Sequence, residues 1–259
     1  MSDRSFFDPD ALHEYGERVQ SPLRRYDFDT VGPGSAKIAE HEHGRVRVFA
    51  EPVAGRTYAI GADVATGRGT DYSAAYVIDL SNAELAAELH GKIEADIYAK
   101  DLHYLGRRYN TARIAVETAG GYGEAVIIAL RDGAAGRRAY PSLYRHILSS
   151  RPDKTVTKTY GFPTNVKTRP LILNHLERHL RERTLPWVTN DLLHEMTEFV
   201  HHNHGVSPRA REGSRDDRVL AAAISLEMFR LYGDIGTKLR TVKKPKRKPQ
   251  SNYPWQRVA

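Results

Sequence analysis

The chain has 259 residues, and its 39 Lys and Arg residues against 32 Asp and Glu give a formal net charge of +7. A hydrophobic content of 40% suffices for a buried core, and the absence of cysteine excludes disulfides, thiolate metal sites and thiol nucleophiles. No apolar run approaches the roughly 20 residues of a membrane span, and the N-terminus lacks a signal-peptide pattern. We therefore expect an intracellular protein without a membrane segment.

The positive charge is concentrated at the C-terminus. Residues 238–259 contain eight basic residues and no acidic one, which leaves the rest of the chain close to neutral. Because this segment also contains three prolines and no apolar periodicity, we predict a flexible basic tail over 237–259. The tail is either simply solvated, or it binds phosphate or an acidic protein surface, with Tyr253 and Trp255 suited to anchoring it.

The elements that precede the tail predict one α/β domain. Residues 1–50, with a short helical pattern at 9–19 and Gly- and Pro-containing stretches after it, are expected to be an irregular extension or interdomain linker. The domain is predicted over 51–236 and begins with a β-hairpin, 57–63 and 73–79, that turns at Gly67–Gly69. The further predicted elements are strands at 89–93, 112–116, 143–147 and 156–160, and helices at 96–109, 125–130, 169–182, 191–201 and 214–232. This order predicts a sheet covered by helices.

Four carboxylates fall where they would converge at one edge of the sheet. Asp63 and Glu117 each end a buried strand, and Asp216 and Asp217 open the last helix, for which Ser214 is the expected N-cap. Carboxylates brought together repel one another and lose hydration, which a bound cation relieves. Oxygen ligands without cysteine indicate Mg²⁺ or Mn²⁺, and two such ions about 4 Å apart can support phosphodiester hydrolysis. Asp63 is then the best candidate to bridge both ions.

Each of these acids alone is more often a turn or cap residue, and only their combination favours a metal site. The histidines at 201–204 are interpreted as residues of a helix C-terminus rather than as metal ligands or an HNH nuclease motif.

Three motifs resemble the nuclease motifs of the large terminase subunits of tailed bacteriophages. They are residues 61–74 (GADVATGRGTDYSA), 116–123 (VETAGGYG) and 213–223 (GSRDDRVLAAA), and the resemblance covers 45–232. It implies an RNase H/RuvC-like fold with a mixed central sheet flanked by helices. It also implies a metal-dependent endonuclease that cuts concatemeric viral double-stranded DNA by a two-metal mechanism and with little sequence specificity.

The resemblance further implies that Asp63, Glu117 and Asp217 are the metal ligands, with Asp216 assisting or substituting. Asp71 matches an auxiliary acidic position, although closure of the hairpin turn is an equally good interpretation. The ATPase motif of a full terminase is missing, because residues 32–37 have the wrong spacing for it. We therefore expect an excised nuclease domain or a separate subunit. Its expected partners in the host cytoplasm are a terminase ATPase domain, the small terminase subunit and the portal or procapsid.

Basic side chains near 161–164 and around the third motif are candidate contacts to the DNA backbone, although solvation is the default for such residues. The candidates are Lys154, Lys158, Lys167, Arg169, Arg209, Arg211, Arg215 and Arg218.

Two other functions remain open. A RuvC-like junction resolvase or a transposase core would keep the fold and change the substrate, although the glycine-rich hairpin and the Asp-Asp helix start favour the terminase. A non-catalytic module that docks on DNA or on the portal would leave the acids as structural residues.

Overall fold

A computed structural model describes residues 4–32, 34–66, 72–119, 121–134, 136–149, 156–201 and 208–233. The predicted turn at 67–69, Asp71, Lys154, the histidines at 202 and 204 and the basic tail lie outside the described residues. In the described part of the chain, no helix has the length and apolarity needed to cross a lipid bilayer.

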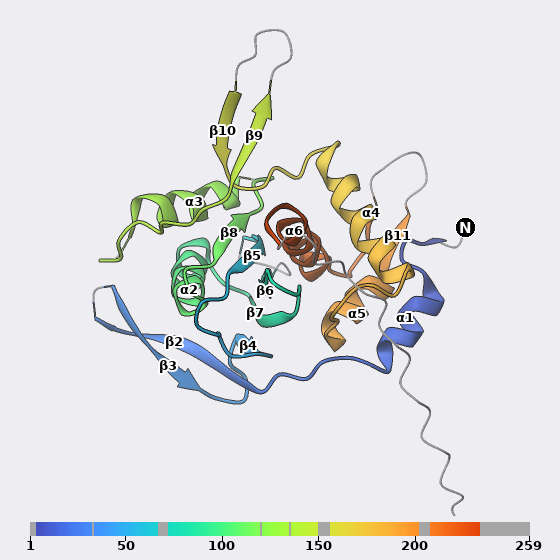
Figure 1. The fold of residues 1–259 in the computed structure, drawn as a ribbon, viewed down its shortest axis with the longest axis horizontal. Helices are drawn as coiled ribbons and strands as arrows, with labels where there is room; N and C mark the ends of the chain where they lie inside the picture. Colours follow the sequence, from blue (N-terminus) through green and yellow to red (C-terminus); the bar gives the residue numbers. More distant parts are fainter. Residues whose placement is uncertain are drawn as a thin grey trace, which may run out of the picture.

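A mixed sheet forms the centre of the fold, and seven of its strands lie in the described residues (Figure 1). In spatial order these are β3 (Ser35–Glu40), β2 (Arg24–Gly32), β4 (Val46–Val48), β7 (Leu85–Gly91), β6 (Ser73–Asp79), β5 (Tyr58–Asp63) and β8 (Arg113–Val116). Neighbouring strands are antiparallel except β5 and β8, which run parallel. The chain passes from β5 to the parallel strand β8 through β6, β7 and a helix. Parallel neighbours need such a long crossover, because a tight turn cannot join them.

Helices cover both faces of this sheet (Figure 1). One face carries α2 (Ala95–Arg108) and α3 (Tyr122–Asp132), and the other carries α1 (Pro9–Gly16), α4 (Thr168–Arg181), α5 (Asn190–Thr197) and α6 (Asp217–Tyr232). The side chains of β5 alternate between the faces, so that Ala59 belongs to the core on the α6 side and Ile60 to the core on the α2 side. Because both faces are covered, every residue of β5 and β6 is buried.

Two small sheets flank the central one. The strands β9 (Arg145–Ser149) and β10 (Val156–Tyr160) form an antiparallel hairpin that projects away from the rest of the molecule (Figure 1). On the α1 side, β1 (Arg4–Ser5), β11 (Phe199–His201) and β12 (Arg209–Ala210) form a short three-stranded sheet. The second sheet joins the N-terminal residues to the segment that precedes α6.

The structure differs from the irregular extension predicted for residues 1–50. Strand β4 pairs with β7, and β2 pairs with both β4 and β3, so this segment extends the central sheet. Helix α1 buries Tyr15, whose hydroxyl donates a hydrogen bond to the Leu185 carbonyl across 2.9 Å. The alternation of Tyr26 and Phe28 with charged residues is a signal for a strand here, but the pattern is too short to be distinctive.

The predicted elements of the domain are confirmed, with shifts at their ends. The third strand is β7 at Leu85–Gly91 rather than 89–93, and the helix predicted over 191–201 divides into α5 and the strand β11. His201 therefore ends a strand, and its interpretation as a helix C-terminal residue is wrong. Helix α6 begins at Asp217 with Asp216 at the N-cap, so Ser214 is not the N-cap that the sequence suggests.

Candidate active site

The first two acidic positions are neighbours across the parallel pair of strands. Asp63 is the last residue of β5, and Glu117 follows directly after β8. The register pairs Ala62 with Val116, and the backbone N–H of Glu117 donates to the Ala62 carbonyl across 2.8 Å. Both carboxylates therefore leave the sheet at the same edge, and both residues are buried.

Helix α6 reaches this edge because its packing against β5 is close. A Cβ atom on Gly61 would lie 2.4 Å from the backbone nitrogen of Ser225 and 2.8 Å from the Ala221 carbonyl oxygen. The Ser225 hydroxyl also accepts a hydrogen bond from the Gly61 N–H across 3.1 Å. The small residues of α6 thus let the helix lie on the strand, and its first residues, Asp216 and Asp217, come to the end of β5.

A loop after β10 fixes the backbone around Glu117. The N–H of Phe162 donates to the Val116 carbonyl across 2.7 Å, and the N–H of Thr118 donates to the Phe162 carbonyl across 3.1 Å. On the other side, a Cβ on Gly123 would lie only 1.7 Å from the Glu117 carbonyl oxygen, so the start of α3 packs directly on this segment. Gly123 of the second motif is therefore required by backbone packing, whereas Gly121 is suited to its position by its positive φ of 84°.

The four carboxylates interact electrostatically. Burial raises the pKa of Asp63 well above its ordinary value, and Glu117, Asp217 and Asp216 raise it further by charge repulsion. Burial also raises the pKa of Glu117 to about 7, against smaller lowering effects from the Ala119 N–H and from Arg169. The structure thus brings together the four acids that the sequence singled out.

These residues fit a divalent cation in donor chemistry and in charge. All four are oxygen donors of the type that Mg²⁺ and Mn²⁺ prefer, and a cation would relieve the repulsion that raises the pKa of Asp63. Within the described residues, no three acidic or histidine side chains are already arranged as a complete set of metal ligands. The arrangement is therefore an open acidic cluster rather than a closed cage.

Arg169 contacts this acidic cluster directly. It is the second residue of α4, and its guanidinium donates a hydrogen bond to the Asp216 carboxylate across 2.9 Å. Its positive charge lowers the pKa of both Asp63 and Glu117. The sequence predicted a DNA contact for Arg169, whereas in the structure its guanidinium contacts the Asp216 carboxylate and the Pro208 carbonyl.

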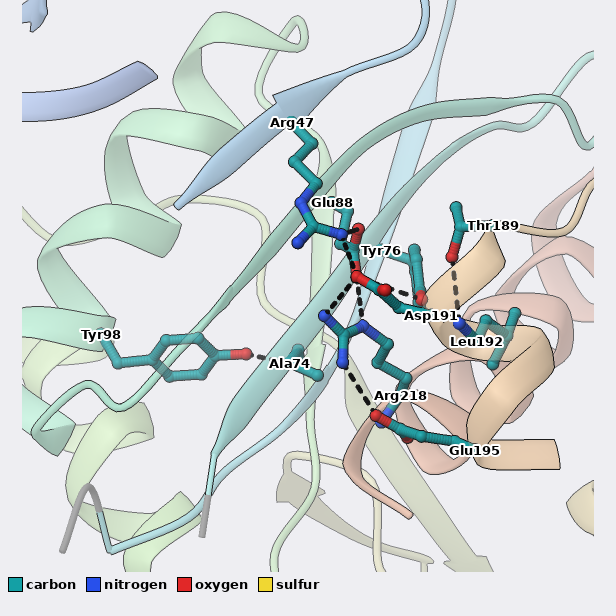
Figure 2. A network of polar contacts seen from close by, with 10 residues as sticks. All are labelled: Arg47, Ala74, Tyr76, Glu88, Tyr98, Thr189, Asp191, Leu192, Glu195 and Arg218. Carbon is teal, nitrogen blue, oxygen red and sulfur yellow. Dashed lines mark hydrogen bonds and ion pairs between the residues drawn. The ribbon is translucent and has the colours of Figure 1, made fainter. Parts of the chain in front are cut away.

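Arg218 was another predicted DNA contact, and the structure contradicts that role. The side chain is buried in a network of ion pairs, in which Nε lies 2.6 Å from Glu88, Nη1 2.9 Å from Glu195 and Nη2 3.1 Å from Asp191 (Figure 2). Arg47 completes the network through Glu88 and Asp191. Because three carboxylates hold its guanidinium inside the protein, Arg218 is not placed to contact a phosphate.

The remaining basic candidates are exposed, on different elements. Lys158 lies on β10 of the projecting hairpin, Lys167 precedes α4, and Arg209 lies on β12. Arg211 pairs with Glu198 across 3.2 Å, and Arg215 stacks on the ring of Tyr72 with Cζ 3.9 Å from the centroid.

Sequence reasoning missed the buried network and the aromatic partner of Arg215. A usable signal existed for Glu88, since a lone acid within the apolar run of β7 needs a buried partner. The identity of that partner, 130 residues away, has no local signal.

Comparison with known proteins establishes the fold. No protein-family profile matches the chain, and no curated protein matches it in sequence. Solved structures do match. The large terminase nuclease of thermophilic phage G20c with bound magnesium gives a TM-score of 0.57 at 19% identity, and the match covers 88% of this chain and 98% of that one.

The cobalt-bound form of the G20c nuclease gives a TM-score of 0.58 at 18% identity, with the same coverage. The large terminase nuclease domain of Thermus phage P74-26 gives a TM-score of 0.55 at 16% identity, and the match again covers 88% of this chain and 98% of that one. The chain is thus similar to terminase nuclease domains in structure, and the predicted RNase H-like fold is confirmed.

Proposed function

We propose that this chain is the nuclease of a viral DNA-packaging terminase and that it cuts concatemeric double-stranded DNA with little sequence specificity. The observation that carries this proposal is the convergence of Asp63, Glu117, Asp216 and Asp217 at one edge of an RNase H-like sheet. The similarity in fold to the terminase nucleases of two phages supports it. An acidic cluster of this kind suits hydrolysis of a phosphodiester with the help of divalent metal.

The roles of the side chains follow from their positions. Asp63, on the strand that lies between β8 and β6, would bridge two Mg²⁺ or Mn²⁺ ions, while Glu117 and Asp217 would each hold one. Asp216, tied to Arg169, would assist. When bound, the ions would supply an activated water and stabilise the leaving oxygen. The close contact between Gly61 and α6 would hold the acids in place, so that little reorganisation would be needed on binding.

The proposed partners follow from the same assignment. A terminase nuclease acts together with an ATPase domain, the small terminase subunit and the portal or procapsid, and we place this chain in that machinery in the host cytoplasm. The acidic cluster would repel DNA in the absence of divalent metal, and the basic residues around it would hold the phosphate backbone without reading bases.

A plasmid-cleavage assay tests the proposal. The protein is incubated with supercoiled plasmid in Mg²⁺ or Mn²⁺, with EDTA as one control. Asp63→Asn removes one charge from the cluster. Asp132→Asn is the matched control, because Asp132 is an exposed acid that ends α3 and pairs with Arg131. We expect cutting by the wild type and by Asp132→Asn, and none by Asp63→Asn or in EDTA.

Three outcomes would contradict the proposal. Unchanged cutting by Asp63→Asn would remove the metal-site interpretation. The absence of cutting in every divalent metal would favour a docking module for DNA or for the portal. Preferential cutting of four-way junctions over linear duplex would favour a junction resolvase.

A further inference from the structure

Tyr72 is the centre of a stack of side chains beside the acidic cluster. The His90 ring lies nearly parallel to the Tyr72 ring, at 8° and with centroids 4.9 Å apart. The Arg215 guanidinium carbon lies 3.9 Å from the Tyr72 centroid, and the Lys92 ammonium lies 5.4 Å from it. Both cations are within the range of a cation–π interaction, and both residues are exposed.

The register of the sheet places this stack next to Asp63. Asp63 pairs with Ala74 on β6, and Ala74 pairs with His90 on β7, so these three residues form one row across three strands. Residues directly opposite one another point to the same face, and Asp63 and His90 therefore share the face covered by α6. Arg215 directly precedes Asp216. The stack thus lies between the sheet and the start of α6.

Arg215 differs from three other arginines around the site. Arg169, Arg211 and Arg218 each form an ion pair with a carboxylate. Among the residues that the structure describes, neither Arg215 nor Lys92 forms an ion pair. A guanidinium stacked on an aromatic ring keeps its in-plane N–H donors available, and these match the geometry of a phosphate.

We propose that Arg215 and Lys92, supported by the ring of Tyr72, form a phosphate-binding platform that holds the DNA backbone beside the acidic cluster. This inference rests on the proposed nuclease function and names the residues that hold the substrate there. These two cations beside the acidic cluster attract the DNA phosphates, which the carboxylates alone would repel.

Tyr72 acts in this platform as a positioning residue. Protein groups already stack on its ring, which favours support of Arg215 over direct stacking on a base. Burial and the nearby arginines lower the pKa of His90 to about 3, so that its ring is neutral and contributes to the stack without competing for the phosphate. An arginine held in one orientation loses less conformational entropy when it binds.

Binding of a fluorescently labelled DNA duplex, measured in Ca²⁺ over a series of salt concentrations, tests the platform. Arg215→Gln should weaken binding about tenfold and reduce the salt slope by about 1, since one phosphate contact is lost. Lys92→Gln should act in the same direction. Tyr72→Leu should weaken binding in the wild-type background but little in the Arg215→Gln background, whereas Tyr72→Phe should bind like the wild type.

Arg138→Gln is the matched control, because Arg138 is an exposed arginine of the segment that follows α3. Circular dichroism and the thermal midpoint verify the fold of each variant. Wild-type affinity and salt slope in Arg215→Gln would overturn the platform, and equal losses in Tyr72→Phe and Tyr72→Leu would overturn the stacking role of Tyr72. If the wild type cuts plasmid while Arg215→Gln binds normally, the platform alone is wrong; if the wild type does not cut, the proposed function is wrong.

Discussion

Arg169 donates a hydrogen bond to Asp216 across 2.9 Å and thereby joins the first turn of α4 to the N-cap of α6. The acidic cluster therefore contains a positive charge of its own. This contact distinguishes Asp216 from Asp217, and it supports the assisting role that we propose for Asp216. Because Arg169 also lowers the pKa of Asp63 and Glu117, it offsets part of the repulsion within the cluster.

Removal of this charge should strengthen the binding of divalent metal. At about pH 8, where more of the cluster is ionised, Arg169→Gln leaves the carboxylates with one more net negative charge, and Mn²⁺ should bind about fivefold more tightly. Calorimetric titration of metal-free protein measures the affinity. Arg178→Gln, an exposed arginine of the same helix, is the control and should bind Mn²⁺ like the wild type. Weaker binding by Arg169→Gln would show that Arg169 orders the ligands instead of competing with the metal.

The metal-free protein should lose stability as the pH rises through the pKa of Glu117. Its folded pKa is about 7 against an ordinary value of 4.5, so neutral Glu117 stabilises the fold below pH 4.5, and this contribution is lost as the pH rises through 7. In EDTA, the free energy of unfolding of Glu117→Gln, taken relative to that of the wild type, should therefore rise by about 3 kcal/mol between about pH 4 and pH 8.

Urea unfolding at both pH values measures this difference. Glu124→Gln, at an exposed acid in the first turn of α3, is the control and should show no comparable change. Addition of Mn²⁺ at about pH 8 should stabilise the wild type more than Glu117→Gln. A difference that does not depend on pH would contradict the assignment.

The buried network around Arg218 should be required for folding. Arg218→Met leaves Glu88 and Glu195 buried without their main partner, which should lower the free energy of unfolding by about 3–5 kcal/mol. Arg211→Met breaks the more exposed pair with Glu198 and should cost less than about 1 kcal/mol. Urea unfolding compares the two variants. Equal, small losses would mean that the network contributes little to stability.

The contact between Gly61 and α6 should tolerate no added methyl group. Gly61→Ala places its Cβ against the backbone of Ser225 and Ala221, and overpacking of this kind should cost about 1–3 kcal/mol. At Gly32 nothing lies within 4 Å of the corresponding Cβ, so Gly32→Ala is the matched control and should be close to neutral. Thermal unfolding measures both. If α6 moves away from β5 in Gly61→Ala, cleavage should fall with stability.

Local pattern predicted the β5–β6 hairpin, strand β8 and the helical run of α6, because these elements have uninterrupted apolar periodicity. It failed for β2 and β4, whose few buried residues alternate with charged ones. These strands join the sheet only because β4 pairs with β7 and β2 pairs with β4. Their stability comes from long-range pairing rather than from the local sequence, which is why 1–50 reads as irregular.

The sequence by itself determined which acids are candidates for the site, because Asp63 ends a buried strand, Glu117 directly follows another, and Asp216 and Asp217 stand at the start of a helix. The tertiary structure alone decided what the arginines do. Arg218 contacts Glu88 from 130 residues away, Arg169 contacts Asp216 from 47 residues away, and Arg215 stacks on Tyr72. The energy of a charged side chain depends on its burial and on the nearest opposite charge, and both are set by long-range packing rather than by neighbours in the chain.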